Sequence, residues 1–130
     1  MLFEDKNVHV MAYNLETILA EKYETIIKRN IGTTRARDFY DLYILFRSRF
    51  SEINQSDFRR AVENTSKKRG STALLLDWNE ICEDIRKEKA LEILWNNYQK
   101  DNHYASGMSF KDVIDNLVAV AQYLNYNKTL

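Results

Sequence analysis

Apolar positions along this chain recur mostly at helical spacing. From Leu15 onward, hydrophobic residues return every three or four positions in about six successive stretches, which is the pattern of amphipathic helices. The chain has no proline and only three glycines, so it lacks most of the residues that interrupt helices. The pattern predicts helices at about residues 15–29, 35–50, 57–69, 77–85, 91–98 and 109–124.

A shorter stretch, residues 7–13 (NVHVMAY), alternates in polarity and is rich in strand-forming residues. It predicts one short strand, which needs a partner because a lone strand is not stable by itself. The partner is either another part of a sheet or a second copy of the chain, a homodimer paired through the open strand edge. We therefore expect a mainly α fold, a bundle of about six helices preceded by one short β-strand, with residues 1–13 as the residual strand of a sheet and residues 14–130 as the helical domain.

Capping residues support several of these helix starts. Asn14 is expected to cap the first helix, where a side-chain oxygen would accept a hydrogen bond from a free backbone N–H. Ser109 with Asp112, and Asp77 with Glu80, have the spacing of capping boxes. These pairs predict where the last and the fourth helix begin.

Composition narrows the class of protein. Hydrophobic residues make up 45% and charged residues 29%, with a formal net charge of zero, which is typical of a globular chain. No apolar run approaches the roughly 20 residues of a membrane helix, and the N-terminus lacks the pattern of a signal peptide. The single cysteine, Cys82, cannot form an internal disulfide, which favours the cytoplasm. No Cys/His cluster has zinc spacing, so we expect no metal site in this chain.

Basic residues gather in two segments of the chain. The first segment holds Lys28, Arg29, Arg35 and Arg37. The second segment holds Arg59, Arg60, Lys67, Lys68 and Arg69. Such clusters are either solvated helix faces or phosphate-binding surfaces, and RNA binding would require the two clusters to share one surface.

A lysine interrupts the apolar face of the first predicted helix. Lys22 lies three residues after Leu19 and four before Ile26, so the three residues share a face. The lysine either extends along its aliphatic stem to water or reaches a polar site.

The second predicted helix carries two acids among apolar residues. Its apolar residues are Phe39, Tyr40, Leu42, Tyr43, Ile44, Leu45 and Phe46. This all-round apolar pattern predicts a buried helix, in which an unpaired Asp38 or Asp41 would cost several kcal/mol. The acids pair with Lys22, Arg35 or Arg37, are protonated, or line a wet cleft.

The runs YNLETILAEKYETIIKRN and TTRARDFYDLYIL carry a recognisable pattern. It consists of Glu-Thr and Ala-Glu-Lys on one helix, a basic residue, and then Arg-x-x-Asp-x-x-Asp-Leu. Its residues here are Glu16, Thr17, Ala20, Glu21, Lys22, Arg29, Arg35, Asp38, Asp41 and Leu42. The chain resembles the C-terminal helical part of the AbiEii-type abortive-infection nucleotidyltransferase toxins, over nearly its whole length and most strongly over residues 12–46.

The resemblance implies a polymerase-β-like nucleotidyltransferase made of two parts. The N-terminal part would be a sheet with a Gly-Ser motif and an Asp-x-Asp pair that holds Mg²⁺, and the C-terminal part a helical bundle. Implied ligands are Mg²⁺ and a nucleoside triphosphate, GTP or CTP, and implied partners are a cognate antitoxin and a tRNA acceptor in phage defence. This chain has no Gly-Ser followed by Asp-x-Asp. We interpret it as a C-terminal portion, from a truncated gene, an excised domain or a split protein, that is inactive without the other half.

The resemblance also implies roles for individual residues. Catalytic roles fall on Lys22, Asp38 and Asp41, and phosphate binding falls on Lys22, Arg29, Arg35 and Arg37. Lys22 would neutralise triphosphate charge, and either aspartate would orient it or assist proton transfer. The alternative function is a non-catalytic helical module for protein interaction or oligomerisation.

Overall fold

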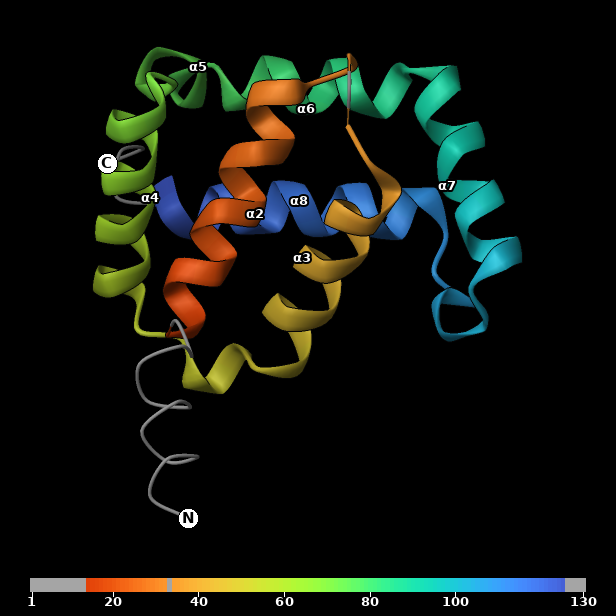
Figure 1. The fold of residues 1–130 in the computed structure, drawn as a ribbon, viewed down its shortest axis with the longest axis horizontal. Helices are drawn as coiled ribbons and strands as arrows, with labels where there is room; N and C mark the ends of the chain where they lie inside the picture. The colour runs from red at the N-terminus through yellow and green to blue at the C-terminus, as the bar shows by residue number, and fades with distance from the viewer. Residues whose placement is uncertain (1–13, 33, 126–130) are drawn as a thin grey trace.

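The computed structural model of the chain describes residues 14–32 and 34–125. In these residues the chain is mainly helical, as predicted, and no strand occurs. The α-helices are α2 (Leu15–Arg29), α3 (Ala36–Ser48), α4 (Gln55–Arg69), α5 (Thr72–Leu76), α6 (Trp78–Lys87), α7 (Lys89–Asp101) and α8 (Phe110–Asn125), with 3₁₀ turns η1 (Phe50–Glu52) and η2 (His103–Ala105) (Figure 1). The predicted strand at residues 7–13 lies outside the described residues.

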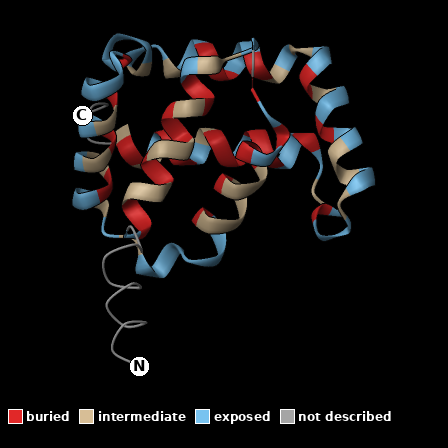
Figure 2. Cartoon of the chain, viewed as in Figure 1, coloured by how far each residue is buried: buried red, intermediate tan, exposed pale blue. Residues whose placement is uncertain are grey.

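Helix α8 runs through the middle of the bundle and packs against α3, α6 and α4 (Figure 1). Helix α2 packs against both α3 and α4, while α7 stands at the far end and contacts α3, η2 and α8. Buried residues follow α2 and α8, and exposed residues follow the outer sides of α4 and α7 (Figure 2). The bundle therefore has one core, and α7 is its peripheral helix.

Helices α2 and α4 run parallel to each other. At their N-terminal ends, the backbone N–H of Asn54 donates to Glu16 Oε2 at 2.7 Å. At their C-terminal ends, Lys28 Nζ donates to the Arg69 carbonyl oxygen at 3.1 Å. The last turns of both helices, which carry Lys28 and Arg29 on α2 and Lys67, Lys68 and Arg69 on α4, therefore lie at the same end of the molecule.

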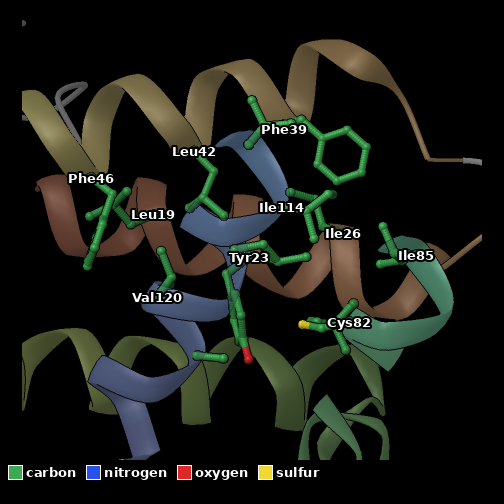
Figure 3. Packing of buried hydrophobic residues seen from close by; sticks show 14 of the residues in the cluster. Leu19, Tyr23, Ile26, Phe39, Leu42, Phe46, Cys82, Ile85, Ile114 and Val120 are labelled. Atoms are coloured by element: carbon green, nitrogen blue, oxygen red, sulfur yellow. The ribbon is translucent and has the colours of Figure 1, made fainter. Parts of the chain in front are cut away.

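The core is built from the apolar faces of these helices. Tyr23 from α2, Phe39 from α3 and Ile114 from α8 point into a common interior (Figure 3). Burial of each such side chain stabilises the fold by about 1.5–3 kcal/mol. Trp95 is fully buried, and its indole Nε1 donates to the Met108 carbonyl oxygen at 2.7 Å, which fastens α7 to the segment before α8.

Two predicted caps are confirmed and one is wrong. Asn14 Oδ1 accepts from the Thr17 N–H at 2.8 Å, and Ser109 and Asp112 exchange the two hydrogen bonds of a capping box at 3.0 and 3.1 Å. The Asp77 side chain makes no capping bond. The reason is α5, a helix that the sequence pattern did not predict: it leads directly into Asp77, whose N–H bonds to Leu74 and whose backbone is not extended as a capping residue requires.

Helix α3 is only partly buried, which corrects the prediction of a helix buried on all sides. Its buried residues are Ala36, Asp38, Phe39, Leu42 and Phe46. Tyr40, Tyr43, Ile44 and Leu45 are half-buried, because no helix covers the outer side of α3 completely. A side of α3 therefore remains open to water.

Candidate functional site

Lys22, Asp38 and Asp41 meet where α2 packs on α3. Lys22 Nζ lies 2.8 Å from Asp41 Oδ2 and 3.4 Å from Asp38 Oδ1. Lys22 stands in the middle of α2, and both acids lie in the first two turns of α3. Of the alternatives for the two acids, the structure shows ion pairing.

Two arginines flank the same carboxylates. Arg35 Nε lies 3.7 Å from Asp38 Oδ2, and Arg37 Nε lies 3.9 Å from Asp41 Oδ2. Their side chains are 66% and 79% exposed, so both guanidinium groups remain largely in water. Three cations thus face two carboxylates. The charged cluster, Lys22, Arg35, Arg37, Asp38 and Asp41, therefore has one more positive than negative charge.

Exposure to water differs sharply between the two acids. The Asp38 side chain is 8% exposed, whereas Asp41 is 24% and Lys22 30% exposed. Asp38 Oδ2 is buried and accepts no hydrogen bond from the described residues. One oxygen of Asp38 is therefore free to accept a further hydrogen bond.

The charge state of Lys22 follows from its surroundings. Burial alone would lower the pKa of Lys22, but the hydrogen bond and charge of Asp41, followed by those of Asp38, raise the pKa above its ordinary value. Lys22 is therefore an ammonium group at neutral pH. It is suited to neutralise an anion and unsuited to accept a proton as a general base.

Comparison with known proteins identifies the family. A family model described as nucleotidyl transferase AbiEii toxin, type IV TA system, matches residues 1–116. The chain belongs to this family. No curated protein matches the chain, and no solved structure matches it. Membership makes the chain a nucleotidyltransferase-like toxin of a toxin–antitoxin system and implies an antitoxin partner.

Arg29 lies apart from the charged cluster of this AbiEii-family chain. It is seven residues, about 10 Å of helix, beyond Lys22 on α2. With Lys28, Gly32 and Arg69 it lines a separate pocket of about 410 Å³. Of the residues that the resemblance assigned to phosphate binding, the structure therefore groups Lys22, Arg35 and Arg37 and places Arg29 elsewhere.

A buried hydrogen-bond network at the wall of that pocket was not predicted from the sequence. Glu24 is completely buried and accepts hydrogen bonds from Arg69 Nη1 and Ser71 Oγ, both at 2.7 Å. Gly70, between them, has a left-handed backbone with φ of 69°, which ends α4 and turns both donors toward Glu24. The signal available in the sequence was an acid on the apolar face of α2, four residues after Ala20 and three before Ile27.

Aromatic residues beside the charged cluster were also missed as a group. The Tyr40 ring lies 4.8 Å from the Tyr104 ring and 6.1 Å from the Tyr98 ring, between centroids. Tyr40 directly precedes Asp41, while its two partners come from residues about 60 positions later. Helical spacing placed Tyr40 and Tyr98 on two separate helices, did not include Tyr104, and carried no information about contacts among the three.

The charged cluster does not fit a magnesium ion. The Lys22 ammonium lies between the two carboxylates that would have to bind the ion, at the distances given above. Among residues 14–32 and 34–125, no group of three or more His, Cys, Asp or Glu side chains is arranged to hold a metal.

No helix in the same residues has the length and apolar character needed to cross a bilayer.

Proposed function

We propose that Lys22, Asp38 and Asp41 form one wall of a nucleoside triphosphate cleft in a cytoplasmic phage-defence toxin. The observation that carries this proposal is the Lys22 ammonium, partly open to water and balanced between two acids, with two exposed arginines beside it. A purely structural ion pair needs no surplus cations. The triphosphate, GTP or CTP in this family, would supply the anion that the cluster lacks.

Phosphate binding is the part of the reaction that these cations serve. Lys22 provides a point charge, and the guanidinium groups of Arg35 and Arg37 provide paired N–H donors that match phosphate oxygens. Both arginines are held to the acids only by contacts of 3.7 and 3.9 Å, which are longer than strong hydrogen bonds. They are therefore able to turn toward a ligand at small cost.

The two acids would have different tasks. Asp41, at 2.8 Å, holds the Lys22 ammonium in place. Asp38 has a buried oxygen without a hydrogen-bond donor among the described residues, and a ligand hydroxyl would satisfy it once the surrounding side chains move aside. Asp38 would thereby position a hydroxyl group or accept its proton. We propose no nucleotide transfer by this chain without a Gly-Ser and Asp-x-Asp half, since its own acids do not fit the metal.

Titration with nucleotide tests the proposal. Isothermal calorimetry with GTP and with CTP, each with Mg²⁺, should detect binding to the chain at millimolar or lower ligand. Lys22→Met should weaken that binding about tenfold, while the matched control Lys111→Met, which breaks an exposed pair with Asp115 of the same 2.8 Å length, should leave it unchanged. Absence of heat at millimolar nucleotide would reject the cleft.

One observation favours a second candidate function, binding of an RNA acceptor such as tRNA. Part of each basic sequence cluster lies at one pocket, because Lys28 donates to the Arg69 carbonyl oxygen and both residues, with Arg29, line it. We propose that this end of α2 and α4 binds the phosphodiester backbone. The affinity for single-stranded RNA should fall with added salt and should weaken in Lys28→Gln, with exposed Lys100→Gln as control. A salt-independent affinity would contradict phosphate contacts.

The alternative interaction module would pair through residues 7–13, outside the described part of the chain. Sedimentation analysis of the chain tests it, because pairing through a strand edge would give a dimer whose fraction rises with concentration.

A further inference from the structure

Three tyrosines form a compact group at the edge of the charged cluster. The tyrosine cluster consists of Tyr40 on α3, Tyr98 on α7 and Tyr104 on η2, with ring centroids 4.8 to 6.2 Å apart. Aromatic rings at these separations attract one another through edge-to-face contacts. The cluster joins the peripheral helix α7 to α3.

Hydrogen bonds and stacking fix the orientation of these rings. The Tyr104 hydroxyl donates to Asn102 Oδ1 at 3.0 Å, so the Tyr98 hydroxyl donates to Tyr104 across the 2.9 Å contact between their oxygens. Trp95, fully buried, stacks on Tyr98 at 5.4 Å with an interplanar angle of 27°. A ring held in this way loses little conformational entropy when a ligand stacks on it.

The tyrosine cluster adjoins the cationic site directly. Tyr40 is three residues after Arg37 and one before Asp41, so Arg37 and Tyr40 share a face of α3. Burial, the hydrogen bond to Tyr104 and the negative charge of Asp41 raise the pKa of Tyr98, whereas Arg37 opposes the rise. The tyrosine hydroxyls thus lie within the electrostatic reach of the Asp41 and Arg37 pair.

Tyr104 differs from its two partners in exposure. Tyr40 and Tyr98 are half-buried, whereas Tyr104 is 56% exposed. Attachment of α7 to α3 is already provided by the contact of Tyr40 with Tyr98 and by the burial of Trp95. An oriented aromatic ring in water, beside a surplus of positive charge, is the arrangement by which proteins stack nucleobases whose phosphates they also bind.

We infer that Tyr104, supported by Tyr40 and Tyr98, is a stacking platform for a nucleobase whose phosphate groups lie at Lys22 and Arg37. This inference rests on the proposed function, because the phosphates set where the base lies. The base belongs either to the nucleoside triphosphate or to the terminal nucleotide of an acceptor RNA, and both present the same aromatic face.

The test separates the base from the phosphates. Calorimetry on the whole chain would use inorganic tripolyphosphate, GTP, CTP and a short single-stranded RNA, with Tyr104→Ala, Tyr104→Phe and the exposed α7 control Ile93→Ala. Loss of base stacking should weaken binding of the base-containing ligand about 5-fold or more in Tyr104→Ala. Tyr104→Phe keeps the ring and should bind within about twofold of the parent chain, as should Ile93→Ala. Circular dichroism confirms that each variant is folded.

The outcomes distinguish this inference from the proposed function. If tripolyphosphate binds the parent chain and binds Lys22→Met more weakly, the phosphate site is supported. If, in addition, Tyr104→Ala and the parent chain bind every base-containing ligand with equal affinity, the stacking platform is overturned. A loss confined to GTP and CTP assigns the base to the nucleotide, and a loss confined to RNA assigns it to the acceptor. A chain that binds none of these ligands at millimolar concentration overturns both the platform and the cleft.

Discussion

Replacement of Lys22 by methionine should destabilise the chain by about 2 kcal/mol, a value between those of exposed and buried ion pairs. Exposed pairs contribute about 0.2–1 kcal/mol, and breaking a buried pair costs about 3–5 kcal/mol. Lys22 is 30% exposed and its nearest partner, Asp41, is 24% exposed, which places the pair between these limits. Among the described residues, Asp38, at 8% exposure, would keep only Arg35 as a cationic neighbour, at 3.7 Å.

A double-mutant cycle isolates the pair from other effects of the substitution. Urea unfolding of Lys22→Met, Asp41→Asn and the double variant should give a coupling energy of about 1 kcal/mol between the two residues. The gross attraction at 2.8 Å is about 1.5–6 kcal/mol for an effective dielectric constant of 80 to 20, and desolvation with side-chain entropy offsets most of it. Asparagine keeps the shape of Asp41, so the cycle reports charge.

Two results would refute this reasoning. A coupling energy near zero would show that the ion pair contributes nothing in solution. A coupling energy above about 3 kcal/mol would make the pair a structural one, as for fully buried pairs, and would leave the ammonium unavailable to phosphate. Only the intermediate value is compatible with a lysine that stabilises the free chain and also changes partner when a ligand binds.

Further predictions concern the core and its ionisable groups. Glu24→Ala should destabilise the chain by about 1–3 kcal/mol, because it leaves the buried Ser71 hydroxyl without an acceptor, while Arg69, whose side chain is 40% exposed, regains water; thermal unfolding measures this, and an unchanged melting temperature would contradict it. Burial raises the pKa of Cys82 to about 12, so a disulfide reagent at pH 8 should modify the folded chain far more slowly than the urea-unfolded chain, and rapid labelling of both would be incompatible with the fold. The pKa values of Cys82 and Lys22 are raised in the folded chain, so the protonated form of each group contributes stability. That contribution is fully present below the pKa that the group has in the unfolded chain, and it is lost as the pH rises toward 12. A free energy of unfolding that increases over this range would contradict both assignments.

Local signals in the sequence predicted most helices and gave ion pairing as one of three alternatives for Asp38 and Asp41. The apolar period of 3.6 marked α2, and the caps at Asn14 and Ser109 marked helix starts, because both depend on residues within one turn. Lys22 and the two aspartates were identifiable because each breaks an apolar pattern. Helix α5 was missed because the run TALLL is too short to show a period.

Contacts between distant segments could not be predicted in the same way. Glu24 meets Arg69 across 45 residues, and the tyrosine cluster joins α3 to residues after 97, so neither leaves a local pattern in the chain. The parallel course of α2 and α4, which brings part of each basic cluster to the same end of the molecule, depends on how the helices pack. The sequence showed that these charges exist, and the fold decides which of them are neighbours.

The most direct test of the central claim is an NMR titration of the isotope-labelled chain with GTP, followed through backbone amide and lysine side-chain signals. We predict that the largest shifts occur at Lys22 and at residues 35–41, with the Lys22 ammonium signal changing as phosphate replaces a carboxylate partner. Shifts confined to Lys28, Arg69 and their neighbours, with the signals of Lys22, Asp38 and Asp41 unchanged, would contradict the account.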